Sequence, residues 1–132
     1  MPKIVNHEAR RLELLDAVWR VIARNGIEGT TMRAIAAETG WSSGVLQHYF
    51  ASKRDILIAA HQLAYARVGE RIGRDNGISS LDTLRNAIIE ALPLDDERLI
   101  EARIEVSAWG MALSDPGFAE IKRQSLETWR KY

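Results

Sequence analysis

The sequence contains no cysteine, which excludes a disulfide framework, a thiolate metal site and a cysteine nucleophile. It also has no excess of charge of one sign, because 18 lysine and arginine residues balance 18 aspartate and glutamate residues. No uncharged apolar run approaches the roughly 18 residues that a membrane span needs, so we expect no membrane partner. The N-terminal residues 1–11, MPKIVNHEARR, lack the apolar stretch of a secretory signal, which favours a cytoplasmic protein.

The spacing of apolar residues is helical nearly everywhere in the 132 residues. In the first segment they recur at three- and four-residue steps on one face: Leu12, Leu15, Val18, Trp19 and Ile22. Capping patterns predict the starts of later helices at Thr31, at Ser52 with Asp55, at Ser79 with Asp82, and at Asp115. The acidic residues 95–97 favour the positive end of a further helix dipole. Because no strand-like alternation is long enough, we predict an all-α fold.

Residues 32–50, MRAIAAETGWSSGVLQHYF, have the spacing of a helix-turn-helix motif. Ala36 is small enough for two helices to cross closely, and Gly40 tolerates the positive φ that the turn needs. We expect the inward apolar anchors of the second helix to be Val45, Leu46 and Phe50. The outward face then carries short or hydrogen-bonding side chains that suit a DNA major groove: Ser42, Ser43, Gly44, Gln47 and His48.

Residues 26–57, GIEGTTMRAIAAETGWSSGVLQHYFASKRDIL, resemble the DNA-binding domain of the TetR family of bacterial transcriptional regulators. The matching positions are Thr31, Ile35, Ala36, Gly40, Gly44, Leu46, Phe50, Ser52, Lys53 and Leu57. The chain departs at Gln47, where the family often has tyrosine, and at Tyr49, where it often has histidine. The resemblance implies a three-helix DNA-binding domain at residues 1–53 and a long fourth helix. That helix leads into a helical ligand-binding and dimerisation domain at residues 54–132, which we expect to be incomplete at its C-terminus.

The resemblance also implies how the chain contacts double-stranded operator DNA. The candidates for groove contacts are Gln47 and His48. Those expected near base edges or phosphate are Ser42, Ser43 and Gly44. Those expected to hold phosphates are Thr31, Arg33, Tyr49 and Lys53. Two alternatives stay open: Gln47 and His48 are ordinary surface residues, and Tyr49 is a half-buried core aromatic.

Residues 101–132 resemble the branch of the same family that includes its choline-responsive regulator. In the family, the inducer pocket lies among helices four to seven. Glu101, Glu105 and Trp109 share a helix face at four-residue spacing, and two carboxylates beside an indole suit a cationic inducer. The alternative is that both glutamates are solvated and only Trp109 is core. Further candidates for ligand contacts are His61, Tyr65, Met111 and Trp129.

These observations predict a homodimeric transcriptional regulator, a repressor released from a palindromic operator by a small-molecule inducer. We expect no catalytic residue, no metal and no cofactor. The His-Glu pair at residues 7–8 lacks the second histidine of a zinc motif, because residue 11 is arginine. Two alternatives remain: an architectural or nonspecific DNA-binding protein without an inducer, and a helical enzyme or protein-interaction adaptor.

The zero net charge does not exclude DNA as a partner, because the charges are unevenly distributed. Residues 1–55 hold eight basic and six acidic residues, whereas the remainder holds ten basic and twelve acidic residues. Nonspecific affinity for DNA comes chiefly from neutralising phosphates. A domain with so small a positive excess is therefore expected to bind through a few placed contacts in a dimer.

Overall fold

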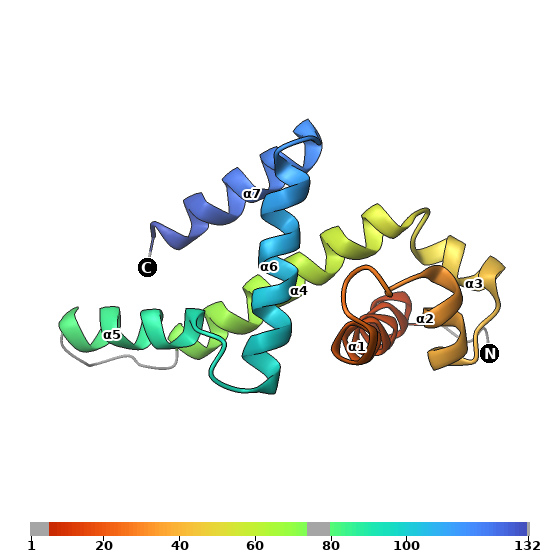
Figure 1. Ribbon diagram of the computed structural model, residues 1–132, viewed down its shortest axis with the longest axis horizontal. Helices are drawn as coiled ribbons and strands as arrows, with labels where there is room; N and C mark the ends of the chain where they lie inside the picture. The colour runs from red at the N-terminus through yellow and green to blue at the C-terminus, as the bar shows by residue number, and fades with distance from the viewer. Residues whose placement is uncertain (1–5, 74–79, 132) are drawn as a thin grey trace. The chain divides into compact units, whose positions relative to one another are not determined.

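The computed structural model describes residues 6–73 and 80–131 (Figure 1). Its helices in these ranges are α1 (His7–Asn25), α2 (Met32–Thr39), α3 (Ser43–Tyr49), α4 (Lys53–Gly73), α5 (Ser80–Ala91), α6 (Asp96–Ala112) and α7 (Pro116–Trp129). The same two ranges contain no strand, so the predicted all-α fold is confirmed. The helices form two compact units: the first unit ends at Ala60 and the second unit begins at His61, so α4 contributes to both.

Short polar side chains fix where several helices begin. The Oγ1 atom of Thr31 accepts a hydrogen bond from the backbone N–H of Ala34 at 3.1 Å, which caps α2 as predicted. Asp95 caps α6 through the backbone N–H of the third residue after it, at 2.8 Å. Asp115 caps α7 in the same manner at 3.1 Å. Each cap satisfies a backbone donor that the helix itself leaves free.

The start of α4 shows the predicted pairing of Ser52 with Asp55. The Oγ atom of Ser52 lies 3.2 Å from Asp55 Oδ2 and accepts a hydrogen bond from the backbone N–H of Asp55 at 3.4 Å. The corresponding prediction for α5 includes Ser79, which lies outside the described residues. The capping prediction is therefore confirmed for α4 and remains a prediction for α5.

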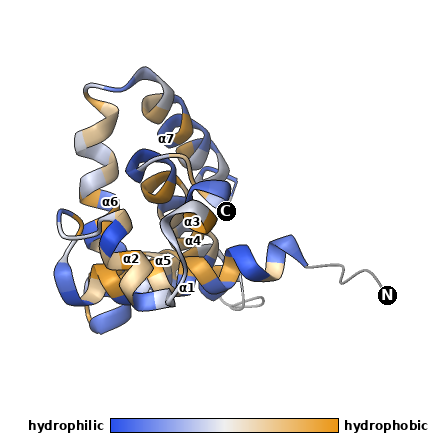
Figure 2. Cartoon of the chain, turned by 90° about the vertical axis from the view of Figure 1, so that its right-hand side faces the viewer, coloured by the Kyte–Doolittle hydropathy of each residue, from blue (hydrophilic) through white to orange (hydrophobic). Residues whose placement is uncertain are grey.

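α1 supplies a large part of the core of the first unit. Its buried residues are Leu14, Leu15, Ala17, Val18, Trp19, Val21 and Ile22. Figure 2 shows hydrophobic and hydrophilic stretches alternating along this helix, as expected for one buried face. Leu12, which the spacing placed on that face, is 48% exposed. It precedes the buried run, which starts only at Leu14, so the prediction was wrong for Leu12.

One predicted anchor of α3 is also wrong. Leu46 and Phe50 are 1% and 4% exposed, as the motif requires, whereas Val45 is 40% exposed. Neighbouring residues on an α-helix are separated by about 100° around its axis. In a helix as short as α3, Val45 therefore faces outward when Leu46 faces the core.

In the second unit, α6 and α7 pack against each other. The apolar residues that they bury are Ile100, Ile104, Ala108 and Phe118. In contrast, α5 buries none of its residues, and its apolar side chains at Leu81, Leu84 and Ile88 are more than half exposed. Among the described helices, none combines the length and apolarity needed to cross a lipid bilayer.

Candidate DNA-binding surface and ligand cavity

The turn between α2 and α3 is built from backbone geometry and two hydroxyl groups. Gly40 ends α2 with φ 72° and ψ 9°, the left-handed conformation that its position was predicted to need. The Oγ1 atom of Thr39 accepts the backbone N–H of Trp41 at 3.1 Å and donates to the carbonyl of Ile35 at 2.9 Å. Ser42 then caps α3 by accepting the backbone N–H of Val45 at 3.3 Å. These contacts fix the direction in which α3 leaves the turn.

The outward face of α3 carries the predicted groove residues. The residues of α3 and its cap that are exposed are Ser42, Ser43, Gly44, Val45, Gln47 and His48. Their side chains include small hydroxyls, an amide and an imidazole, which can hydrogen-bond to base edges. Val45 adds an apolar group of the kind that contacts the methyl group of thymine. The structure therefore presents a polar face with one methyl-rich patch on a short helix.

Tyr49 is the centre of a ring cluster at the end of α3. Its ring stacks on that of His7 with centroids 4.6 Å apart, and it lies 5.8 Å from each of the rings of Trp41 and His48. Tyr49 and Trp41 are both half-buried. The sequence did not predict the contact of His7 with Tyr49, because the two residues lie more than forty positions apart and no local pattern links them.

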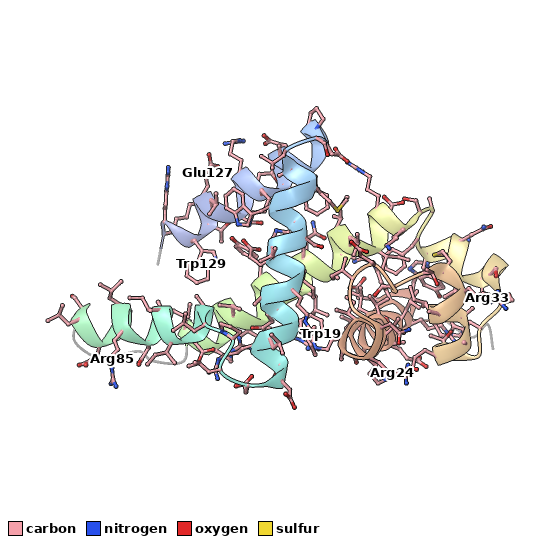
Figure 3. All side chains as sticks on the ribbon, in the orientation of Figure 1. Trp19, Arg24, Arg33, Arg85, Glu127 and Trp129 are labelled. Carbon is pink, nitrogen blue, oxygen red and sulfur yellow. The ribbon has the colours of Figure 1, made fainter. Side chains whose placement is uncertain are left out.

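The predicted phosphate contacts lie on exposed or partly exposed positions of the first unit. Arg33 is exposed and projects outward (Figure 3). The ammonium group of Lys53 donates to the carbonyl of Glu28 at 3.1 Å. Since an ammonium group has three donors, this contact leaves Lys53 further donors for a phosphate. Thr31 is exposed while it caps α2.

The carboxylate of Glu38 joins α1 to α2. Glu38 accepts a hydrogen bond from Arg20 Nε at 2.7 Å and another from Arg24. These bonds hold the pKa of Glu38 below its usual range. Two of the basic residues in the first unit therefore share one carboxylate, although both side chains remain more than half exposed.

The second unit contains a cavity of about 400 Å³ between α4, α5, α6 and α7. Four predicted ligand residues line it: Tyr65, Glu101, Glu105 and Trp129. The other three predicted residues are not on its wall. His61 is fully buried next to Tyr65, with ring centroids 4.8 Å apart, whereas Trp109 is 47% exposed and Met111 is half-buried.

Ion pairs supply the polar part of the cavity wall. Arg71 binds Glu101 with two hydrogen bonds of 2.9 and 2.6 Å, and it also pairs with Glu90. Arg98 holds the other oxygen of Glu90 at 2.5 Å. Burial opposes the ionisation of Glu90, but hydrogen bonds from Arg98 and Arg71 outweigh it and lower its pKa. Glu90 and Arg98 were not predicted from the sequence. The alternative of a solvated Glu101 beside a core Trp109 is wrong, because Glu101 is only 7% exposed whereas Trp109 is 47% exposed.

Glu105 is also paired within the chain. Lys122 from α7 donates to its Oε1 atom, and His61 Nδ1 lies 3.4 Å from its Oε2 atom. Burial opposes ionisation of Glu105, but contacts with His61 and Lys122 prevail and lower its pKa. Burial, together with the charge of Glu105, raises the pKa of Tyr65 to about 12. The cavity therefore contains ionised carboxylates and a neutral phenol.

Similarity to known proteins agrees with this arrangement. Residues 14–60 match the family described as bacterial regulatory proteins, tetR family. The chain is 36% identical over 107 residues to the HTH-type transcriptional regulator PksA of Bacillus subtilis (strain 168). This match covers 79% of the chain and 52% of PksA. It is 30% identical over 128 residues to the HTH-type transcriptional regulator BetI of Stenotrophomonas maltophilia (strain R551-3), covering 93% of this chain and 64% of BetI.

A solved structure extends the likeness to the fold. The crystal structure of a transcriptional regulator from Rhodococcus sp. Rha1 has a TM-score of 0.81 and 30% identity, and the match covers 92% of this chain and 65% of that one. The fold and motif thus define a protein with a helix-turn-helix domain that is similar to regulatory proteins. The similarity to the tetR family of bacterial regulatory proteins is carried by residues 14–60, and the chain spans between half and two thirds of the length of these three relatives. Since the relatives are regulators, the family supports a role other than catalysis.

Proposed function

We propose that the protein is a sequence-specific transcriptional repressor that reads operator DNA with α3. The exposed polar face of α3, held by a glycine turn and anchored by Leu46 and Phe50, is the observation that carries this proposal. Gln47 and His48 contact base edges, and Ser42, Ser43 and Gly44 approach bases or phosphate. Thr31, Arg33, Tyr49 and Lys53 hold phosphates. The small positive excess of residues 1–55 supports placed contacts over nonspecific attraction.

The operator form follows from the proposed homodimer. Two copies related by a two-fold axis place two α3 helices in successive major grooves of a palindromic site. Each subunit then contributes only a few contacts, and the dimer sums them. This arrangement would give useful affinity to a domain of low net charge.

A small-molecule inducer in the cavity of the second unit completes the proposal. Its carboxylates at Glu101 and Glu105, and its rings at Tyr65 and Trp129, favour a cationic compound. Both glutamates already have partners within the chain, so a cation must compete with Arg71 or Lys122. If inducer and operator binding are coupled, the coupling is reciprocal: operator DNA weakens inducer binding by the same factor.

Selection from a random duplex pool tests the DNA-binding proposal. Gln47→Ala is expected to change the preferred sequence, since it removes a base contact. Lys53→Ala is expected to weaken binding to all sequences and to reduce the slope of log affinity against log salt by about 1.

Exposed arginines provide a matched control. Arg33→Ala removes a predicted phosphate contact, whereas Arg85→Ala removes the same charge from an exposed position on α5 (Figure 3). We expect only R33A to weaken binding. The proposal fails if no sequence is enriched, as for a nonspecific DNA-binding protein, or if the chain shows no retention on DNA at low salt, as for an adaptor.

A further inference from the structure

Lys122 is a buried cation in the second unit. Its side chain is 2% exposed. Lysine is rarely buried to this extent unless it has a partner. Its Nζ atom lies 4.3 Å from the ring centroid of Trp109 and 5.3 Å from that of Tyr65, and it donates to Glu105. Two aromatic faces and a carboxylate around one ammonium group are the components of an ammonium-binding cage.

The cage and the cavity share walls. Tyr65 and Glu105 line the cavity, and α7, which carries Lys122, contributes Leu126 and Trp129 to it. His61 Nδ1 lies 3.4 Å from Oε2 of the same carboxylate and has no hydrogen-bond partner among the described residues. A cation that enters the cavity therefore meets Tyr65 and Glu105, which already hold Lys122.

We propose that Lys122 is a tethered ligand of this cage and that small ammonium compounds bind by displacing it. This inference rests on the proposed inducer site and names its chemical class and its competitor. An entering ammonium group takes the carboxylate of Glu105 and the face of Tyr65, and the Lys122 ammonium leaves to solvent. The charge of the buried cluster is unchanged by the exchange. Since Lys122 belongs to α7, the exchange releases α7 from one of its contacts with α6.

Tetramethylammonium is the probe for the first experiment, with sodium chloride at equal ionic strength as the control. Lys122→Met keeps an unbranched side chain, shorter by one atom, and removes the ammonium group. We expect tetramethylammonium to bind this variant about tenfold more tightly or better, because it no longer competes with a tethered cation. Arg123→Met removes a charge from the next residue of α7, which is exposed and pairs with Glu120 and Glu127, and it should bind the probe as wild type does.

The affinity is measured by tryptophan fluorescence and calorimetry on the whole chain. A folded Lys122→Met variant that binds tetramethylammonium no more tightly than wild type overturns the proposal. A gain that persists in the double variant with Glu105→Gln also overturns it, because the carboxylate of the cage would then be irrelevant.

A second measurement covers the case in which Lys122→Met does not fold. Reductive methylation of wild type, followed by mass spectrometry, reports how accessible each lysine is. Tetramethylammonium should raise the methylation rate of Lys122 and leave that of the exposed Lys131 unchanged. An unchanged rate at Lys122 refutes displacement.

The two proposals can fail separately. If the chain enriches an operator sequence but neither experiment with tetramethylammonium gives the expected result, the proposed repressor function is supported and the proposed displacement of Lys122 is refuted. If no sequence is enriched, the proposed repressor function is refuted. The displacement of Lys122 is then still tested by the affinity measurement and by the methylation measurement.

Discussion

Thr31 combines a structural role with a predicted DNA contact. Its hydroxyl caps α2, and its exposed position lets a phosphate approach. Thr31→Ala is expected to lower the free energy of unfolding by about 1 kcal/mol through loss of the cap. Thr31→Asp retains a good cap but repels phosphate. We therefore expect T31D to keep the wild-type melting temperature and to bind the selected duplex more weakly.

Thermal denaturation and titration of a labelled duplex separate the two roles of Thr31. Thr31→Ser, which keeps both the cap and the hydroxyl, is the control and should resemble wild type in both measurements. Wild-type affinity in a folded T31D variant would remove Thr31 from the DNA interface.

Glu105 makes the stability of the second unit dependent on pH. Its pKa is lower in the folded chain than its usual value near 4.5. Its contribution to stability is therefore fully present above that value and is lost as the pH falls through the folded pKa. Glu105→Gln is expected to destabilise the chain by about 2 kcal/mol at pH 7, since it weakens a charge-assisted contact with buried Lys122.

Denaturant titrations between pH 3 and pH 7 measure this effect. The difference in unfolding free energy between wild type and E105Q should shrink as the pH falls below 4.5. A difference that is independent of pH would mean that the ionised carboxylate does not stabilise the fold.

At the level of the helices, substitution of glycine by alanine is expected to have opposite effects on stability at Gly40 and at Gly110. Gly40 ends α2 with a positive φ, and open space surrounds the position of a Cβ atom, so Gly40→Ala meets backbone strain alone. We expect it to cost about 1–2 kcal/mol. Gly110 lies inside α6 with no atom near a Cβ and no positive φ, so Gly110→Ala should stabilise the chain by about 0.5–1 kcal/mol.

Chemical denaturation of both glycine variants provides the comparison. A stabilising Gly40→Ala would show that the turn can relax to a negative φ. A destabilising Gly110→Ala would show that α6 is packed more tightly at this residue than the structure describes.

The helix boundaries could be predicted from the sequence because their causes are local. A cap joins residues three apart, as Thr31 does with Ala34, and the turn depends on one glycine at residue 40. The outward direction of Val45 could not be predicted in the same manner. In a helix of two turns, adjacent apolar residues leave open which of them faces the core.

The lining of the candidate cavity was predictable only in part, and the pairing of its charged residues was not predictable. Glu101 and Glu105 were expected near Tyr65 and Trp129, and all four line the cavity. Arg71 lies thirty residues from Glu101, and Lys122 lies seventeen residues from Glu105. Such pairs depend on how helices pack, which spacing within one helix does not specify.

For the whole molecule, the proposed dimer predicts a strict dependence on operator geometry. Inserting about five base pairs between the half-sites turns one of them to the opposite side of the duplex, whereas about ten restores its orientation. We expect the first insertion to reduce affinity more than the second in electrophoretic shift titrations. Equal affinity for both duplexes would indicate that each subunit binds independently.

The exposed face of α3 has a consequence for how such a protein changes its target. Ser43, Val45, Gln47 and His48 project from a helix whose attachment depends on Leu46 and Phe50. Substitutions at exposed positions usually alter stability by less than about 0.5 kcal/mol. If α3 reads DNA as proposed, recognition can therefore diverge during evolution at the exposed positions while the turn and its two anchors keep the fold, so that gene duplicates can acquire new operators without first losing stability.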